Sequence, residues 1–254
     1  MTLTDSDIER FARQLVLPEL NEEGQEKLQA AHLVLVGLGG LGAPVLAYLV
    51  GAGVGKLTLI DSDIVDLSNL QRQFIYEMTD IGSPKTQAAA RFAKARNPAV
   101  EIISIAERLD ETNAKRLITG ADLVIDASDL LETRLILAAA AKAQGIGHLF
   151  GGAVRYDGQL CLFTPHLDAE APCFGCLFDA APDPDQAPNC QQAGILGPVV
   201  GMIGCLMAGE ALKYITAIGD EPASSLLLYD GLSNRFETIK FGRKPDCLIC
   251  GPQN

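Results

Sequence analysis

The chain has 254 residues, of which 48% are hydrophobic and 20% are charged, as expected for a globular protein with a full core. Its 32 acidic and 20 basic residues give a net charge of −12, which repels a phosphate backbone and argues against general nucleic-acid binding. The N-terminal sequence lacks the pattern of a signal peptide, and the longest apolar stretch, 41–54, is short and interrupted, so we expect a cytoplasmic protein without a membrane span.

Strands and helices are expected to alternate along residues 1–152. Thr4 followed by Asp7 resembles a capping box, which predicts a helix ending at Leu15, and Ser83 is expected to cap the helix that begins at Pro84. The further expected helices are 22–30, 42–51, 84–96, 111–119 and 131–144, and the expected strands are 32–36, 57–60, 100–106, 122–126 and 147–151. This alternation indicates a parallel sheet with right-handed crossovers.

The pattern changes after Gly152. A strand at 158–164, a polar loop at 179–192, a helix at 198–214 and a hairpin of strands 225–230 and 234–241 are expected there. The fold class is therefore α/β, with a Rossmann-like, doubly wound, mostly parallel sheet and a C-terminal antiparallel extension.

A glycine motif after the first strand predicts a nucleotide site. The sequence Gly37-x-Gly39-x-x-Gly42 joins this strand to a helix, and Asp61 ends the next strand. Glycines let the backbone approach a phosphate at the helix N-terminus, and the acid is placed to bind ribose hydroxyls. The alternative is a tight turn of the kind that any doubly wound fold contains.

Charged residues further along the chain favour ATP over NAD. Arg72 and Lys85 can neutralise a triphosphate, and Asp129 can hold Mg²⁺, neither of which a dinucleotide requires. Taken singly, Arg72 or Lys85 would be read as a solvated surface charge.

These motifs resemble the MoeB/ThiF (HesA/MoeB/ThiF) family, bacterial relatives of the ubiquitin-activating enzymes. The resemblance rests on Gly37-Leu-Gly-Gly-Leu-Gly42, Leu67-Ser-Asn-Leu-Gln-Arg-Gln73, Pro84-Lys85 and paired Cys-x-x-Cys motifs, and it runs from Arg10 to Gly251. It implies a Mg-ATP site, with the cofactor-binding residues Gly37, Gly39, Gly40, Gly42, Asp61, Asp63, Ser68, Asn69, Leu70, Gln71, Arg72, Lys85 and Asp129.

Two further positions are interpreted through the resemblance. Arg13 matches a family arginine that crosses a homodimer interface to the neighbouring ATP, although the residue alone would be read as a helix-surface charge. Leu130 departs from the family, which usually has a polar residue, often Asn, after the aspartate that Asp129 matches.

The cysteines predict a structural zinc site. Cys173-x-x-Cys176 and Cys247-x-x-Cys250 form two matched knuckles, whose four thiolates would complete tetrahedral zinc and leave no open position. Four unrelated thiols are the alternative. Of the remaining cysteines, Cys161 and Cys205 are expected to be buried packing residues.

Cys190 lies at the end of the polar loop, where an exposed thiolate could react. In some members of the family the matching cysteine bonds covalently to an activated carrier protein, and in others it is dispensable. An ordinary exposed thiol is therefore the alternative to a covalent role for Cys190.

By resemblance, the chain is an adenylyltransferase that activates the C-terminal glycine carboxylate of a ubiquitin-like sulfur-carrier protein ending in Gly-Gly, for thiamine (thiazole) or molybdopterin biosynthesis. The expected catalytic residues are Arg13, Arg72, Lys85, Asp129 and Cys190. The sulfur donor, a cysteine desulfurase or a rhodanese, is expected to be a separate protein. The alternatives are an NAD-dependent oxidoreductase and a non-catalytic scaffold subunit of an activating enzyme.

The resemblance also divides the chain into three parts. Residues 1–30 are expected to form a helical arm at the dimer contact, and residues 31–152 the Rossmann-like ATP-binding region. Residues 153–254 are expected to form a carrier-binding extension with the zinc knuckles and a crossover loop, within one continuous globular unit.

Overall fold

The structure is a computed structural model that describes residues 3–178, 193–219 and 225–251. One eight-stranded sheet runs through it in the order β3-β2-β1-β4-β5-β6-β7-β8. The strands are β1 (His32–Val36), β2 (Lys56–Ile60), β3 (Glu101–Ile105), β4 (Leu123–Asp126), β5 (Gly147–Val154), β6 (Asp157–Phe163), β7 (Ser225–Asp230) and β8 (Arg235–Lys240). The first five strands pair in parallel and the last three pair antiparallel, which confirms the predicted fold class.

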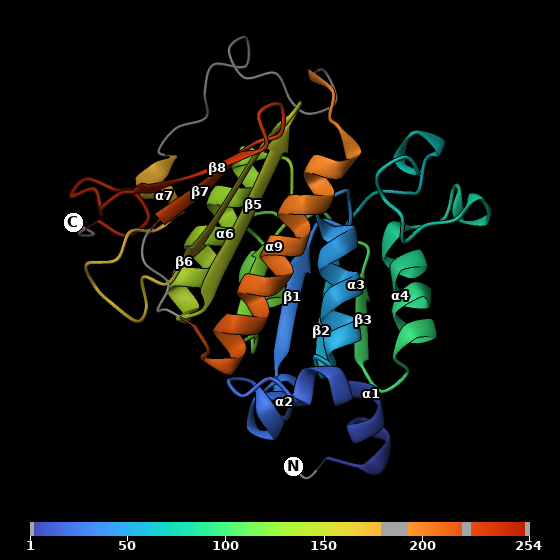
Figure 1. The fold of residues 1–254 in the computed structure, drawn as a ribbon. Coiled ribbons are helices and arrows are strands. Elements are labelled where there is room, and N and C mark those ends of the chain that lie inside the picture. The colour runs from blue at the N-terminus through green and yellow to red at the C-terminus, as the bar shows by residue number, and fades with distance from the viewer. Residues whose placement is uncertain (1–2, 179–192, 220–224, 252–254) are drawn as a thin grey trace.

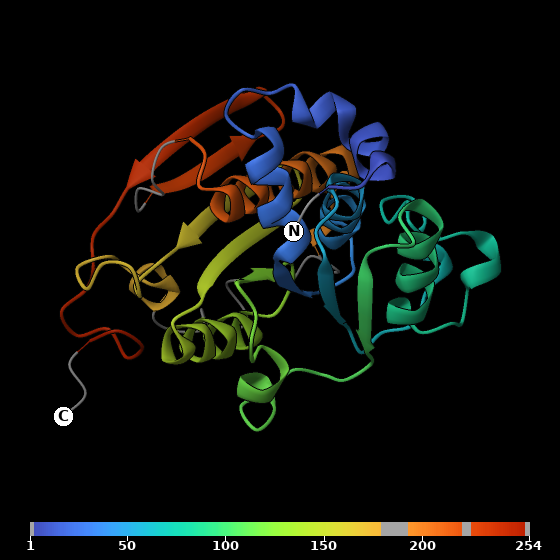
Figure 2. The same cartoon turned by 90° about the horizontal axis from the view of Figure 1, so that it is seen from below.

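Helices cover both faces of the sheet (Figures 1 and 2). They are α1 (Asp5–Leu15), α2 (Asn21–Ala30), α3 (Gly42–Ala52), α4 (Lys85–Arg96), α5 (Ala114–Leu117), α6 (Leu131–Gln144), α7 (Phe174–Leu177) and α9 (Gly197–Thr216), with short 3₁₀ turns η1 (Leu67–Asn69) and η2 (Met78–Asp80). Helices α3, α4 and α9 lie on one face, and α5 and α6 lie on the other. Helix α2 ends beside the start of β1, so the N-terminal helices lie at the amino ends of the parallel strands.

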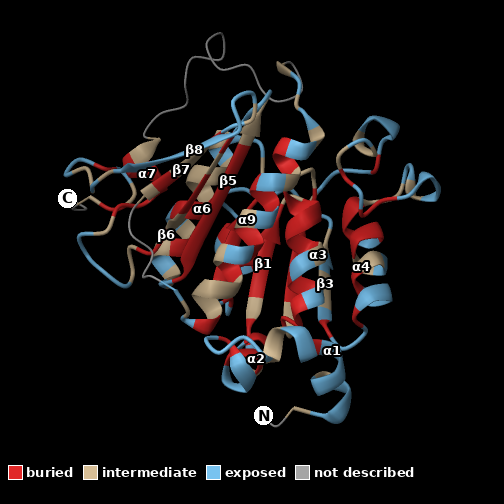
Figure 3. Cartoon of the chain, in the orientation of Figure 1, coloured by how far each residue is buried: buried red, intermediate tan, exposed pale blue. Residues whose placement is uncertain are grey.

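The sheet alternates its side chains between two cores. In β1, Leu33 and Leu35 pack toward α3 and α9, whereas Val34 and Val36 pack toward α5 and α6. Both faces of the central strands are therefore buried, as Figure 3 shows in red. This double burial explains why β1 and β4 are near-continuous apolar runs rather than alternating ones.

Helix α9 is the one described helix that is long and apolar enough to cross a membrane by length and composition. It packs against α3, β5 and β6 in this fold. Its residues Ile203 and Met207 are fully buried in the main core. The apolar character of α9 is accounted for by that packing.

Most expected elements are present, with local corrections. Ser83 does not cap a helix: α4 begins at Lys85, because the segment before it pairs like a strand, with a bridge between Ile64 and Pro84. The helix expected at 111–119 is confined to Ala114–Leu117, since the Asp110 carboxylate accepts hydrogen bonds from Thr112 and Asn113 and holds a turn there.

Two further expectations differ from the structure. Strand β5 continues to Val154 because it pairs with β6 from His148 to Val154. Cys161 is buried as expected, but Cys205 is exposed on α9, so the expectation that it is a buried packing residue was wrong.

Candidate active site

A cleft of about 1010 Å³ opens at the carboxyl ends of the parallel strands. It lies where the strand order reverses between β1 and β4, which is the usual ligand position in a doubly wound sheet. The predicted site residues that line it are Gly37, Gly39, Gly40, Asp61, Asp63, Ser68, Asn69, Gln71, Arg72, Lys85 and Asp129. Leu130, the residue that departs from the family pattern, also lines it, whereas Gly42, Leu70 and Arg13 do not.

The glycines leave the start of α3 open to the cleft. Gly37 has a φ of +91°, and a Cβ built on Gly42 would lie 2.1 Å from the Gly37 carbonyl oxygen, so both positions require glycine. A Cβ on Gly40 would lie 2.8 Å from Val200 Cγ2. The N-cap residue of α3, Leu41, makes no side-chain capping bond, so the free N–H groups of this helix end can bind an anion.

Asp61 ties this glycine loop to the next strand. Its Oδ2 accepts a hydrogen bond from the Leu38 N–H at 2.7 Å, and its Oδ1 accepts one from the Asp63 N–H at 2.8 Å. Burial raises the pKa of Asp61, and the nearby Lys85 charge opposes that rise. The carboxylate therefore orders the loop and still lines the cleft.

Lys85 is a buried cation at the start of α4. Its Nζ lies 2.8 Å from Asp63 Oδ2, and its side chain is 7% exposed against 66% for Asp63. Its backbone N–H donates to the Asp63 carbonyl, which fixes the helix start against the loop after β2. The lysine is thus held at the cleft wall by a carboxylate that is itself open to solvent.

The segment around Arg72 begins at a capping box. The Asp66 side chain accepts the Ser68 N–H, and the Asn69 side chain accepts the Asp66 N–H. Arg72 then reaches back over η1, and its Nη1 donates to the Ser68 carbonyl at 3.0 Å. Leu70 packs against the main core instead of the cleft.

The turn after β4 carries Asp129, an exposed carboxylate. Asp126 accepts hydrogen bonds from the Ser128 N–H and hydroxyl, and Arg134 donates to the Ser128 carbonyl. Arg134 also lies over the Phe150 ring, 4.7 Å from its centroid. Two side chains, Asp126 and Arg134, therefore hold Ser128 through three hydrogen bonds, and Asp129 is the next residue.

Several cleft residues were not predicted from the sequence. They are Asp66, Gln73, Glu107, Arg108, Ser128, Thr133 and Arg134. Gln73 is 3% exposed, and its Oε1 has no hydrogen-bond partner among the described residues, so it offers an acceptor to a bound molecule. Gln73 ends the Leu67–Gln73 motif, and this position is the sequence feature that could have identified it as a cleft residue.

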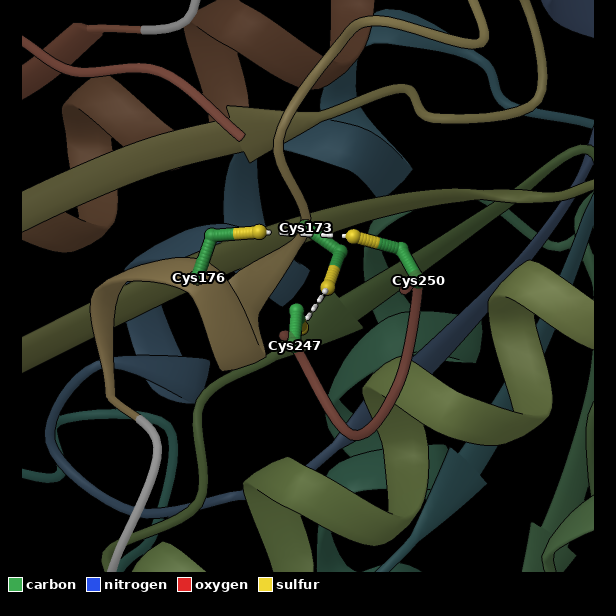
Figure 4. Close-up of side chains that lie close together, drawn as sticks. All are labelled: Cys173, Cys176, Cys247 and Cys250. Atoms are coloured by element: carbon green, nitrogen blue, oxygen red, sulfur yellow. Dashed lines mark hydrogen bonds between the residues drawn. The ribbon is translucent and has the colours of Figure 1, made fainter. Parts of the chain in front are cut away.

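A second cluster lies away from the cleft, and Figure 4 shows it. The Sγ atoms of Cys173, Cys176, Cys247 and Cys250 are buried and lie within 4.8 Å of one another. Cys173 and Cys247 are 3.6 Å apart, and Cys176 and Cys250 are 3.3 Å apart. Tetrahedral zinc with bonds of about 2.3 Å requires sulfurs about 3.8 Å apart, so this donor set fits zinc.

The thiols of the cluster influence one another. Burial raises the pKa of Cys173, and the neighbouring thiols raise it further. At Cys247, burial acts to raise the pKa. Backbone hydrogen bonds from Cys250 and Ile249 outweigh this effect and lower the pKa to about 7. The Lys244 N–H also donates to Cys176 Sγ at 3.4 Å.

The two remaining predicted catalytic residues are Arg13 and Cys190, of which the structure describes Arg13. Arg13 is exposed on α1, at the amino ends of the strands and so at the opposite end of the sheet (Figure 1). Helix α1 is fixed there through Phe11, which packs under Gly53, and through Gln14, which bonds Gln25. Cys190 lies outside the described residues.

A family model described as the ThiF family matches residues 11–249. The sulfur carrier protein adenylyltransferase of Thermus thermophilus is 42% identical over 100% of this chain and 94% of its own length. The SAMP-activating enzyme E1 of Haloferax volcanii is 38% identical over 99% of this chain and 92% of its own length.

Solved structures show the same fold. The crystal structure of MccB from E. coli with AMPCPP and MccA superposes with a TM-score of 0.84 and covers 98% of this chain and 75% of that one. At 22% sequence identity this likeness supports the architecture alone.

Proposed function

The chain belongs to the ThiF family, and on that premise we propose that it uses ATP to adenylate the C-terminal glycine carboxylate of a ubiquitin-like sulfur-carrier protein ending in Gly-Gly. It is an adenylyltransferase of the ThiF and MoeB type. One observation carries the proposal: the open start of α3, Asp61, Arg72, Lys85 and Asp129 line a single cleft. An NAD-dependent oxidoreductase does not need the cations Arg72 and Lys85. A non-catalytic scaffold subunit does not need any of these ATP-binding groups.

The reaction joins the carrier carboxylate to the α-phosphorus of ATP and breaks its bond to pyrophosphate. A carboxylate is already nucleophilic at neutral pH, so the site needs no general base. Arg72 and Lys85 neutralise the charge on the phosphates, and the N–H groups at the start of α3 bind them. Catalysis then consists of positioning and charge neutralisation.

Mg²⁺ would supply further neutralisation of the triphosphate, and Asp129 is the residue we assign to hold it. Its exposed carboxylate lines the cleft, and carboxylate oxygens are the ligands that Mg²⁺ prefers. Asp61 and Asp63 are the neighbouring acids at the end of β2, and Asp61 is the one placed for the ribose.

Arg13 completes the site only from a second copy of the chain. It is exposed at the opposite end of the sheet from the cleft, so it cannot be assigned to the cleft of its own subunit. We assign it to the neighbouring site of a homodimer, with residues 1–30 as the dimer contact. Residues 153–254 then form the extension that binds the carrier.

The sulfur step follows adenylation. A separate donor, a cysteine desulfurase or a rhodanese, would carry the sulfur as a persulfide, which displaces AMP from the acyl-adenylate to form an acyl disulfide, either directly or after Cys190 has displaced the AMP to form a thioester. A thiol would then reduce the disulfide bond of this intermediate and release the carrier. The product would be a carrier thiocarboxylate for thiamine or molybdopterin synthesis in the cytoplasm. The four cysteines would hold a structural Zn²⁺ that anchors the C-terminal tail to α7.

The test is the carrier-dependent exchange of labelled pyrophosphate into ATP. Asp129→Asn and Arg72→Ala should each lower this exchange by about 100-fold or more, the loss typical of one charge-stabilising group. Both residues line the open cleft, so the melting temperature should change little. Exchange at the wild-type rate in both variants would refute the assignment of the site residues. Tighter binding of NAD than of ATP would refute the assignment of ATP as the nucleotide.

Cys190→Ala separates the two steps in the same assay. Adenylation needs only ATP and the carboxylate, so exchange should persist while thiocarboxylate formation is lost. Unchanged thiocarboxylate formation would show that sulfur is delivered directly.

A further inference from the structure

Asp126, the last residue of β4, is a fully buried carboxylate next to the cleft. Its Oδ1 accepts the Ser128 N–H at 3.0 Å and the Ser128 hydroxyl at 2.6 Å. These two bonds fold the chain into a turn directly before Asp129. The carboxylate thereby determines where the backbone leaves the sheet and enters the cleft.

A second buried side chain holds Asp126 from behind. His148 lies on the adjacent strand β5, and its Nε2 is 3.2 Å from Asp126 Oδ2. The ring is 2% exposed and packs against Phe163 and Phe174, each with ring centroids 5.8 Å away. The imidazole therefore has a single position relative to the carboxylate.

The hydrogen bonds also indicate the tautomer of His148. Its Nδ1 is buried and has no hydrogen-bond partner among the described residues. A proton on Nδ1 would leave a buried donor unpaired, so the neutral ring with the proton on Nε2 is favoured. In that tautomer Nε2 donates to Asp126, and all three bonds to this carboxylate are donated to it.

Packing alone does not account for this pair. A buried ionised or hydrogen-bonded pair is seldom more stable than apolar side chains of similar volume, and the surrounding residues are apolar. These hydrogen bonds instead stabilise the turn after β4. Asp126 accepts from the Ser128 N–H and hydroxyl, and Arg134 donates to the Ser128 carbonyl. Asp129 is the next residue and lines the cleft.

We propose that His148, acting through Asp126, is a positioning residue that holds Asp129 in place for the Mg²⁺ of the bound nucleotide. This inference rests on the role assigned to Asp129 above. Groups that orient a metal ligand through a hydrogen bond typically contribute 10- to 100-fold to metal affinity or activity. Through two intervening residues the effect should lie at the lower end, about 10-fold.

The test compares binding of a non-hydrolysable ATP analogue with and without Mg²⁺, by calorimetry on the full chain. The dissociation constant without Mg²⁺ divided by that with Mg²⁺ measures how much Mg²⁺ strengthens binding, and we call this ratio the Mg²⁺ gain. In His148→Leu this gain should fall about 10-fold, while binding without Mg²⁺ stays within about 2-fold of wild type. Turnover should show a raised KM for Mg-ATP and a smaller change in kcat.

Two variants separate positioning from packing. His148→Gln keeps an N–H near the position of Nε2 and should restore most of the Mg²⁺ gain. Phe163→Leu removes packing on the ring without touching Asp126, so it should lower the melting temperature and leave the gain unchanged. If His148→Leu does not fold, His148→Asn, whose amide is one methylene shorter, takes its place.

The outcomes distinguish this inference from the proposed function. A wild-type Mg²⁺ gain in His148→Leu, or in the His148→Asn that replaces it, together with a lost gain in Asp129→Asn, would overturn the role of His148 alone. A wild-type gain in Asp129→Asn would overturn the assignment of Asp129 first. A loss of gain in His148→Leu that Phe163→Leu reproduces would show that His148 serves packing only.

Discussion

The cleft and the cysteine cluster are built in opposite ways. The cleft takes single side chains from the ends of β1, β2 and β4 and from the loops that follow them, and its charged groups are partly open to solvent. The cluster takes all four thiols from two short knuckles and buries every one of them. One site leaves room for a large molecule, whereas the other has a donor set that could hold a single metal ion.

This difference bears on what each site can do. Four protein ligands leave zinc no open position, so the cluster can stabilise the chain and cannot bind a substrate. The cleft holds its cations with carbonyls and carboxylates, as Lys85 is held by Asp63, and keeps about 1010 Å³ for a ligand. Substitutions in the cluster should therefore reduce stability, and substitutions in the cleft should reduce activity.

The largest effect is expected from removing the metal of the cluster. Purified protein should contain about one zinc ion per chain, and Cys250→Ser or chelation should lower the unfolding free energy by several kcal/mol. At about 2–4 °C per kcal/mol for a chain of this size, the melting temperature should fall by about 10 °C or more. Metal analysis and thermal denaturation measure both quantities.

Cys205→Ser is the matched control, because this thiol is exposed on α9 and is not part of the cluster. It should leave the zinc content and the melting temperature unchanged. A zinc-free chain that melts at the wild-type temperature would contradict the structural role of the cluster.

A smaller effect is expected from mixing inactive subunits, which tests whether the cleft is complete within one chain. If Arg13 acts across a dimer, Arg13→Ala mixed with Asp129→Asn should restore pyrophosphate exchange to about a quarter of wild type. Half of the random dimers are then mixed, and each mixed dimer has one intact site.

Arg72→Ala mixed with Asp129→Asn is the control for this experiment. Both residues line the cleft of one chain, so no mixed dimer regains an intact site. Equal recovery in the two mixtures, or none in the first, would contradict the placement of Arg13.

The parts that the sequence predicts well are those with local patterns. The glycine loop, the capping box at Thr4 and the two cysteine knuckles each depend on neighbouring residues, and the structure contains all three. Buried strands were predicted within a few residues because both of their faces are covered.

Pairings between distant segments could not be predicted in this way. His148 meets Asp126 only because β4 and β5 are adjacent and in a particular register, which no local pattern encodes. Glu107 and Arg108 line the cleft only because β3 lies beside β2. Helix 111–119 was predicted too long for a local reason instead, because hydrogen bonds to Asp110 replace its first turn.

The smallest expected effect concerns the turn that carries Arg72. It tests whether a charged side chain, Asp66, orders this part of the cleft. Hydrogen bonds from the Ser68 side chain and N–H lower the pKa of Asp66 below its usual 3.8. The folded chain therefore favours the carboxylate, so the stabilisation is complete above pH 3.8 and is lost as the pH falls through the lower folded pKa. Amide exchange of the Ser68 N–H should lose protection over that range, and Asp66→Ala, which has no side-chain acceptor, should show reduced protection at every pH. The Ala127 N–H, which donates to the Val36 carbonyl inside the sheet, is the control and should keep its protection throughout. Equal protection of Ser68 in wild type and Asp66→Ala at pH 6 would show that the capping carboxylate does not order this turn.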